Sequence, residues 1–469
     1  MTAPRVYTTA PGVPVAEAFA RGFEARHGAD DPLRRAATEV LTNTPRSRTL
    51  IEQALAAAAG GAALLPRIRL LTEIGADPLD APHLPPAIEP LRRHLRLVRL
   101  VEAYLAQEPE GRAPLSAAPA LAEALAALMD ECDEAGLDPD ALDGAVAEDQ
   151  AAHWQRTLAF VDLVRRNWPK IRAQHEGGAL DPKDRQRRAV DALIAGWETA
   201  PPETPVIAAG STGAVASTGR LMAAIARLPE GTVVLPGLDR ELPREIWARI
   251  RDGEAPEHPQ APFARVLTAL GLAPADVAPW EEAPASPRRR LATEALRPAP
   301  VSDAWHAALP GLAHGTEAAC DGLTLVEADS PRAEAGAVAL AIRRALAGPG
   351  TRVALVTPDA GLARRVTAEL ARFRVTPDDS LGRPLAQTPP AVFLRLVLSV
   401  AVDGAEAARL AALLQHPMCR AGHSRTAHLA HARAYEIAAL RRPLAVPPAG
   451  ALPPWPPPRR ERGERWPEP

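Results

Sequence analysis

The spacing of apolar and polar residues along the chain predicts which segments are strands and which are helices. The clearest stretch runs from Val206 to Asp239. An apolar run at Val206–Ala209 meets a loop of Gly, Ser and Thr, a segment with helical period follows, and a second apolar run stands at Val233–Leu235. Two buried strands joined by a loop and a helix form the repeating unit of a parallel α/β sheet.

The same criteria divide the rest of the chain. Residues 1–90 and 201–273 carry strand and helix patterns and are predicted to form a first α/β lobe, whereas long helical periodicities predict a helical insertion over residues 91–200. Residues 274–320 are rich in Pro, Ala and Arg, which is typical of a linker. A second α/β lobe with a helical part is expected over residues 321–440.

Two apolar runs predict strands in that second lobe, at Leu323–Glu327 and Val353–Val356. The composition changes abruptly at Pro443. From there onward the sequence is rich in Pro and Arg and has no apolar periodicity. Such a composition cannot bury a core, so residues 441–469 are predicted to be disordered. Frameshift read-through in a GC-rich gene and a genuine functional tail both account for it.

Composition narrows the class of protein. The chain has 469 residues, enough for two to four domains, and only 4% are aromatic, which favours helices packed through small side chains. Its net charge is −3, so no global basic field indicates a nucleic-acid partner. Lysine occurs only at Lys170 and Lys183, so arginine supplies nearly all of the positive charge. Either GC-rich coding or phosphate recognition by the arginine side chain explains this usage, and GC-rich coding is favoured.

The cysteines and the N-terminus indicate an intracellular protein. Cys132, Cys320 and Cys419 lie far apart without metal-ligand or disulfide spacing, so neither a zinc site nor a disulfide framework is expected. No signal pattern and no long apolar stretch is found, so no membrane partner is expected. We therefore expect a cytoplasmic location.

A nucleotide-hydrolysing loop is missing from the sequence. Such a loop requires G-x-x-x-x-G-K-[ST], because its lysine reaches the β- and γ-phosphates. No Gly-Lys-Ser or Gly-Lys-Thr occurs in the chain, and no lysine precedes Lys170. We therefore expect a nucleotide-motor-type fold without motor chemistry.

Six motifs in order give a resemblance to a known family. The chain resembles the AddB subunits of the bacterial AddAB helicase–nucleases, in their alphaproteobacterial form, from its N-terminus to about Leu440. The motifs are Val206–Asp239, His258–Gly271, Val277–Trp280, Glu327–Glu334, Val353–Asp359 and Asp379–Pro389.

This resemblance implies a fold and a function. The fold would consist of degenerate superfamily-1 helicase lobes, which are RecA-like parallel sheets. The function would be processing of double-strand DNA breaks for recombinational repair, beside an AddA-like motor and nuclease subunit, with single-stranded DNA as the ligand. Loop Thr8–Pro14 stands where a Walker A loop would and lacks the lysine. The family's iron–sulfur cluster and magnesium belong to a C-terminal nuclease domain beyond this chain, which resembles the N-terminal half, so no cofactor and no catalysis are expected here.

Several polar residues are candidates for contact with single-stranded DNA. Arg46 and Arg48 follow a strand-to-helix turn, where hydroxyls and arginines can contact phosphates, and Arg67 and Arg69 offer a similar case. Surface arginines without a ligand are the alternative. The stretch that holds Arg383 and Gln387 is predicted to be a loop-to-helix transition, with inter-lobe structure as the alternative to DNA contact.

Two further features have alternative interpretations. The loop Gly210-Ser211-Thr212-Gly213 has the composition of a phosphate cradle at a helix start, although an ordinary tight strand-to-helix turn is favoured. Trp154 and Trp168 could stack on bases, although core packing is favoured. For the whole chain, the alternative to a DNA-binding scaffold is an interaction protein that docks on a partner and does not bind DNA.

Overall fold

The chain divides into two compact units, Met1–Leu323 and Thr324–Pro469. The structure is a computed structural model that describes residues 4–28, 31–75, 81–107, 115–137, 166–313, 315–380, 382 and 384–441. The predicted tail, apart from Arg441, lies outside the described residues.

A six-stranded, all-parallel sheet organises the first unit, with the strand order β3-β2-β4-β5-β1-β6. The strands are β1 Val6–Thr9, β2 Glu39–Thr42, β3 Arg67–Leu70, β4 Val206–Ala209, β5 Gly231–Pro236 and β6 Ala278–Pro279. The α/β class predicted from the sequence is confirmed, and the sheet is consistent with a RecA-like fold.

Side chains of β1, β2, β4 and β5 alternate between two cores, one on each face of the sheet. Val206 and Ala208 of β4 belong to one core, and Ile207 and Ala209 belong to the other. Both faces are buried because crossover helices cover them, and β4, with the sequence VIAA, is accordingly apolar throughout. One face carries α8 (Ala216–Arg227), α9 (Arg244–Arg251) and α10 (Ala261–Leu270). The other carries α1 (Val15–His27) and α3 (Pro45–Ala58).

The stretch predicted to be a linker is instead part of the first unit. Val277 is fully buried in the sheet core, β6 pairs with β1, and Trp280 is only 2% exposed. Two large apolar side chains thus anchor a segment whose Pro, Ala and Arg content is otherwise typical of a linker. It continues in helices α11 (Pro287–Ala295), α12 (Trp305–Ala313) and α13 (Thr316–Cys320).

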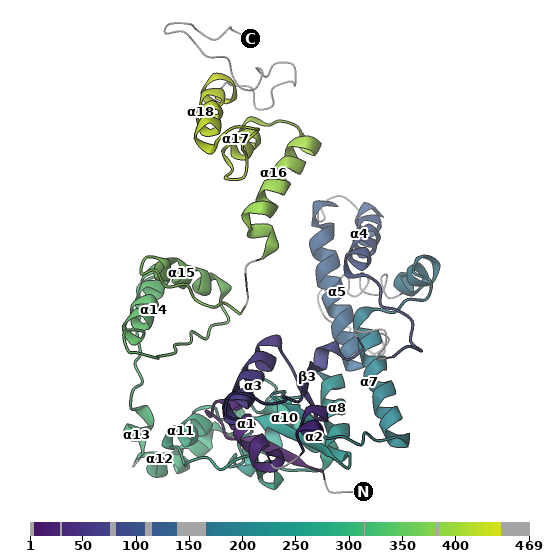
Figure 1. The fold of residues 1–469 in the computed structure, drawn as a ribbon, viewed down its shortest axis with the longest axis vertical. Coiled ribbons are helices and arrows are strands. Elements are labelled where there is room, and N and C mark those ends of the chain that lie inside the picture. The colour runs from purple at the N-terminus through teal and green to yellow at the C-terminus, as the bar shows by residue number, and fades with distance from the viewer. Residues whose placement is uncertain are drawn as a thin grey trace. The chain divides into compact units, whose positions relative to one another are not determined.

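A helical group lies between β3 and β4 in the sequence, and Figure 1 shows its helices α4, α5 and α7 near one another. Their bounds are α4 Pro90–Gln107, α5 Ala118–Ala135 and α7 Pro182–Thr199. Leu97, Val101 and Leu125 form its core together with Trp168, which is 3% exposed. Val190 of α7 belongs to the sheet core, so α7 joins this helical group to the sheet.

The second unit differs from the predicted α/β lobe. The part of it that the structure describes contains helices and no strand. The helices are α14 Pro331–Ala345, α15 Ala360–Ala371, α16 Pro389–Asp403, α17 Ala407–Gln415 and α18 Arg425–Tyr435. The segments predicted as strands, Leu323–Glu327 and Val353–Val356, form no strand, and all of their residues are exposed. Among the described residues, no helix of either unit is long and apolar enough to cross a membrane.

Candidate nucleic-acid interface

The loops that follow the strands of the first unit gather along one edge of the sheet, because all six strands run in the same direction. In open α/β sheets, ligands bind outside the carboxyl ends of the strands. The edge comprises the turns after β1, β2, β4 and β5, and it is the part of the unit in which a site is expected.

The turn between β2 and α3 is exposed and rich in hydroxyl groups. Thr44 caps α3: its Oγ1 accepts a hydrogen bond from the Ser47 N–H at 3.0 Å, and Pro45 occupies the first helical position. This start agrees with the preference for Thr before a helix and for Pro at its first residue. The cap directs the side chains of Arg46 and Arg48 to the helix surface, where Arg46 is exposed and Arg48 is partly exposed.

The electrostatics of this helix start favour an anion. The first turn of α3, which is described in full, contains no acidic residue, and it holds both Arg46 and Arg48. Cations at a helix N-terminus oppose the helix dipole, so the arrangement is unfavourable unless negative charge lies nearby. Glu73 Oε1 lies 3.9 Å from Arg48 Nη1, and both side chains are partly exposed. An exposed ion pair of this kind contributes little to stability.

The other two candidate arginines, Arg67 and Arg69, lie at different positions along β3. Arg67 pairs in register with Glu39 at the amino end of β2, three residues from the carboxyl edge. Arg69 lies nearer that edge, but its Nη1 contacts the Glu39 carboxylate at 3.2 Å. Arg46 and Arg48 therefore share the β2–α3 turn, whereas Arg67 lies at the opposite end of its strand.

The Gly210–Gly213 loop follows β4 at the same edge, and its polar groups are used within the protein. The Gly210 N–H donates to the Val234 carbonyl at 3.4 Å, and the Gly213 N–H donates to Ser211 Oγ at 3.3 Å. Both glycines have positive φ angles, of 77° and 72°. A Cβ at Gly213 would lie 2.5 Å from Val266 Cγ2. Close packing of α10 against the loop thus accounts for its glycines, while Thr212 is partly exposed.

A crevice opens between the carboxyl ends of β1 and β5, where the chain leaves the sheet toward opposite faces. Two adjoining cavities of about 620 and 720 Å³ occupy it. Its walls carry five carboxylates, namely those of Asp239, Glu241, Glu281, Glu282 and Glu294. Thr293 of α11 donates a hydrogen bond to Asp239, so α11 closes over the crevice. The same walls carry the arginines Arg240, Arg288, Arg289 and Arg290, so the charges that line the crevice are mixed. Two of the carboxylates, those of Glu281 and Glu294, are also paired with Arg21 and Arg297.

His258 lines the second cavity and is 7% exposed. Its Nδ1 accepts a hydrogen bond from the Gln260 N–H at 3.1 Å, so the other ring nitrogen carries the proton in the neutral form. Burial lowers the pKa of His258, and the negative charge of Asp239 opposes that shift. The ring is thus held neutral as part of the packing around the crevice.

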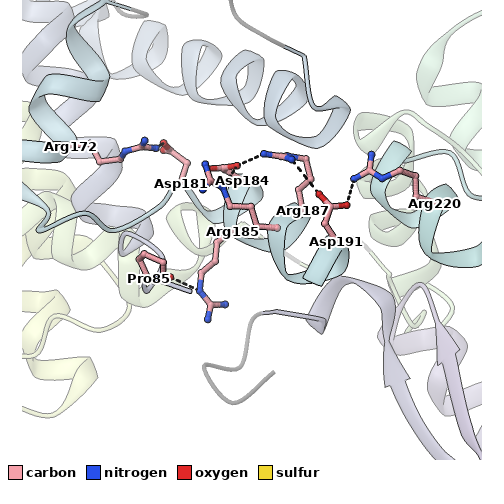
Figure 2. A network of polar contacts seen from close by, with 9 residues as sticks. Pro85, Arg172, Asp181, Asp184, Arg185, Arg187, Asp191 and Arg220 are labelled. Carbon is pink, nitrogen blue, oxygen red and sulfur yellow. Dashed lines mark hydrogen bonds and ion pairs between the residues drawn. The ribbon is translucent and has the colours of Figure 1, made fainter. Parts of the chain in front are cut away.

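A chain of ion pairs along α7 was not predicted from the sequence (Figure 2). Arg187 Nη2 contacts Asp184 at 2.6 Å, and its Nη1 lies 3.4 Å from Asp191. Arg220 of α8 contacts the other oxygen of Asp191 at 2.9 Å. These side chains link α7 to α8, so they position helices and are not available as a cationic surface.

Asp181, before the start of α7, is the centre of a second cluster. Its carboxylate accepts hydrogen bonds from Arg93 Nε at 2.7 Å, Arg172 Nη1 at 2.9 Å and Trp168 Nε1 at 3.0 Å. The indole of Trp168 is therefore buried and fixed, which agrees with core packing and leaves no face for a base. Trp154 lies outside the described residues. Burial, followed by the charges of Asp181 and its neighbours, raises the pKa of Asp133 on α5 to about 6.

The remaining candidates belong to the second unit. Gln387 is exposed at the end of a short 3-10 helix, Leu385–Gln387, and its backbone N–H donates to the Pro384 carbonyl at 2.9 Å. Arg383 lies outside the described residues. Their contact with DNA stays a prediction.

Comparison with protein-family models finds no match for this chain, and comparison with curated protein sequences finds none.

Proposed function

We propose that this chain is a non-catalytic scaffold that holds single-stranded DNA along the carboxyl edge of the sheet in its first unit. The observation that carries the proposal is the β2–α3 turn, where two arginines, a helix N-terminus and exposed hydroxyl groups lie together without an acidic residue in the helix's first turn. Arginine and hydroxyl side chains and helix N-termini are the groups that contact backbone phosphates. Contacts of this kind give affinity without sequence specificity.

The scaffold would act as an AddB-like subunit beside an AddA-like motor and nuclease subunit, in the processing of double-strand DNA breaks. One feature supports a passive role: the loop after β1 contains no lysine that could reach the phosphates of a nucleotide. In this arrangement the partner supplies the ATP-driven movement, and this chain receives the strand.

Binding of a labelled oligo-thymidine to the full chain, followed by fluorescence anisotropy at low salt, tests the proposal. Replacing both Arg46 and Arg48 with Gln should weaken binding at least about tenfold, since hydrogen bonds to charged groups contribute about 1.5–3 kcal/mol each. The matched control replaces Arg249 and Arg251 with Gln near the end of α9, where each pairs with a neighbouring acid, and should leave binding nearly unchanged.

Two results would overturn the proposal: no binding of the oligonucleotide at low salt, or equal weakening by both pairs of substitutions. Retention of an AddA-like partner without DNA would then favour a docking protein instead.

A further inference from the structure

Glu73 brings a carboxylate to the β2–α3 turn from the neighbouring strand. It ends the short 3-10 helix Leu71–Glu73, which follows β3 at the carboxyl edge of the sheet. Its Oε1 lies 3.9 Å from Arg48 Nη1, while its Oε2 accepts a hydrogen bond from the Leu70 N–H at 3.3 Å. One oxygen of the carboxylate thus faces Arg48, and the other is tied to the backbone of its own segment.

The segment that carries Glu73 is anchored to the rest of the first unit. Leu71 and Ile74, on either side of the exposed positions, are buried in the sheet core. The Gln186 side chain of α7 donates a hydrogen bond to the Thr72 carbonyl at 3.1 Å. The backbone that bears the Glu73 side chain is therefore fixed from two sides, and its carboxylate is held beside the β2–α3 turn.

The contact with Arg48 places a negative charge beside a helix start that has none of its own. The first turn of α3, whose residues are all described, holds Arg46 and Arg48 and no acidic residue. Cations in that position oppose the helix dipole, and Glu73 supplies part of the compensating charge. A DNA phosphate bound by Arg48 would lie close to the same carboxylate, and two negative charges so placed repel each other.

We propose that Glu73 is a built-in competitor of the DNA phosphate for Arg48. Because Glu73 borders the same turn, this role rests on the function proposed above. Without DNA, the carboxylate holds the guanidinium of Arg48, and a phosphate must displace it or bind beside it. Glu73 therefore lowers the affinity of the sheet edge for single-stranded DNA, which suits a scaffold that receives a strand from a partner and releases it again.

Anisotropy titrations of labelled oligo-thymidine with the full chain test this role. Glu73→Gln removes the charge but keeps an oxygen that can accept the Leu70 N–H. It should raise the affinity about two- to fivefold, the size expected of an exposed charge pair. The increase should shrink as salt is added, because salt screens exposed charges. Glu198→Gln is the matched control: this exposed carboxylate lies near the end of α7, which leads to the opposite edge of the sheet, and the affinity should stay unchanged.

A double-mutant cycle with Arg48→Gln separates competition for Arg48 from general repulsion of DNA. If Glu73 acts by holding Arg48, Glu73→Gln should have little effect in the Arg48→Gln chain. An equal increase in both backgrounds, or no increase in the wild-type background, would overturn the role of Glu73. If the wild-type chain binds the oligonucleotide and the double arginine variant binds it less, the proposed function stands even when Glu73→Gln brings no increase.

Discussion

Trp280 stacks on Phe19, with ring centroids 5.8 Å apart and ring planes 7° from parallel. The two residues are 261 positions apart in the sequence, and Trp280 Nε1 donates a hydrogen bond of 3.0 Å to the Phe19 carbonyl. The guanidinium carbon of Arg26 lies 3.9 Å from the centroid of the indole ring. The residue after the last strand thus holds the first helix against the sheet.

Replacing Trp280 with Ala should lower the free energy of unfolding of the first unit by about 3–5 kcal/mol, because it removes a large buried side chain and leaves a cavity. Urea unfolding followed by circular dichroism measures the change. Trp305→Ala is the matched control, since Trp305 is 44% exposed, and it should cost much less. Equal shifts for both variants would contradict the anchoring role assigned to Trp280.

The glycines of the edge loops offer a second matched pair. Gly12 and Gly213 have φ angles of 80° and 72°, but a Cβ at Gly12 meets nothing within 4 Å, whereas one at Gly213 meets Val266. Gly12→Ala should cost only the backbone strain, about 1–2 kcal/mol. Gly213→Ala should cost roughly 1–3 kcal/mol more, because overpacking adds to that strain. Thermal unfolding of the two variants decides the point, and a larger loss for Gly12→Ala would refute the packing assigned to this loop.

The stability of the protein should depend on pH through Asp133. Its pKa is raised to about 6 in the folded state, so the folded protein binds this proton more tightly than the unfolded chain, whose carboxyl titrates near about 4. The stabilisation is present in full below about pH 4 and is lost as the pH rises to about 6.

Asp133→Asn isolates this effect, because the amide does not titrate. The stability of the variant relative to the wild type should increase from pH 4 to pH 6 and stay constant above that. The measurement is the urea midpoint of both proteins at each pH. A difference that does not change with pH would contradict the environment assigned to Asp133.

Salt provides a quantitative check of the proposed DNA contacts. For single-stranded DNA, the logarithm of the binding constant falls with the logarithm of salt concentration by about 0.7 per phosphate contacted. If Arg46 and Arg48 each neutralise one phosphate, replacing both with Gln should reduce that slope by about 1.4. Anisotropy titrations at several salt concentrations give the slope directly. An unchanged slope would mean that these arginines affect binding without contacting phosphate.

Local patterns predicted the first unit well where a strand and its neighbours each carry several apolar residues. The Val206–Leu235 unit is the clearest case, because the successive apolar residues of its two strands lie in the two cores on opposite faces of the sheet. β6 was missed because a strand of two residues has no periodicity, and only Val277 and Trp280 mark it. The strands expected in the second unit failed for a different reason, since an apolar pattern indicates that a segment can pair but does not supply its neighbour.

The candidate site was predictable only in part. The hydroxyl and proline pattern around Thr44 indicated a helix start, and the structure places Arg46 and Arg48 there. Whether Arg67 and Arg69 belong to the same edge depends on the register between β2 and β3, which the order of residues does not reveal. The network around Asp181 escaped prediction because its members, Arg93 and Arg172 among them, come from distant segments.

The position of β1 in the sheet has a consequence for biosynthesis. Both of its neighbours, β5 and β6, are made much later, so the first strand to leave the ribosome is among the last to be enclosed. At about 5–20 residues per second, Val6 and Tyr7 wait on the order of 15–55 s for the segment that contains Trp280. During that interval β1 has neither of its sheet neighbours, and an unpaired strand edge of this kind favours association of the nascent chain with other chains.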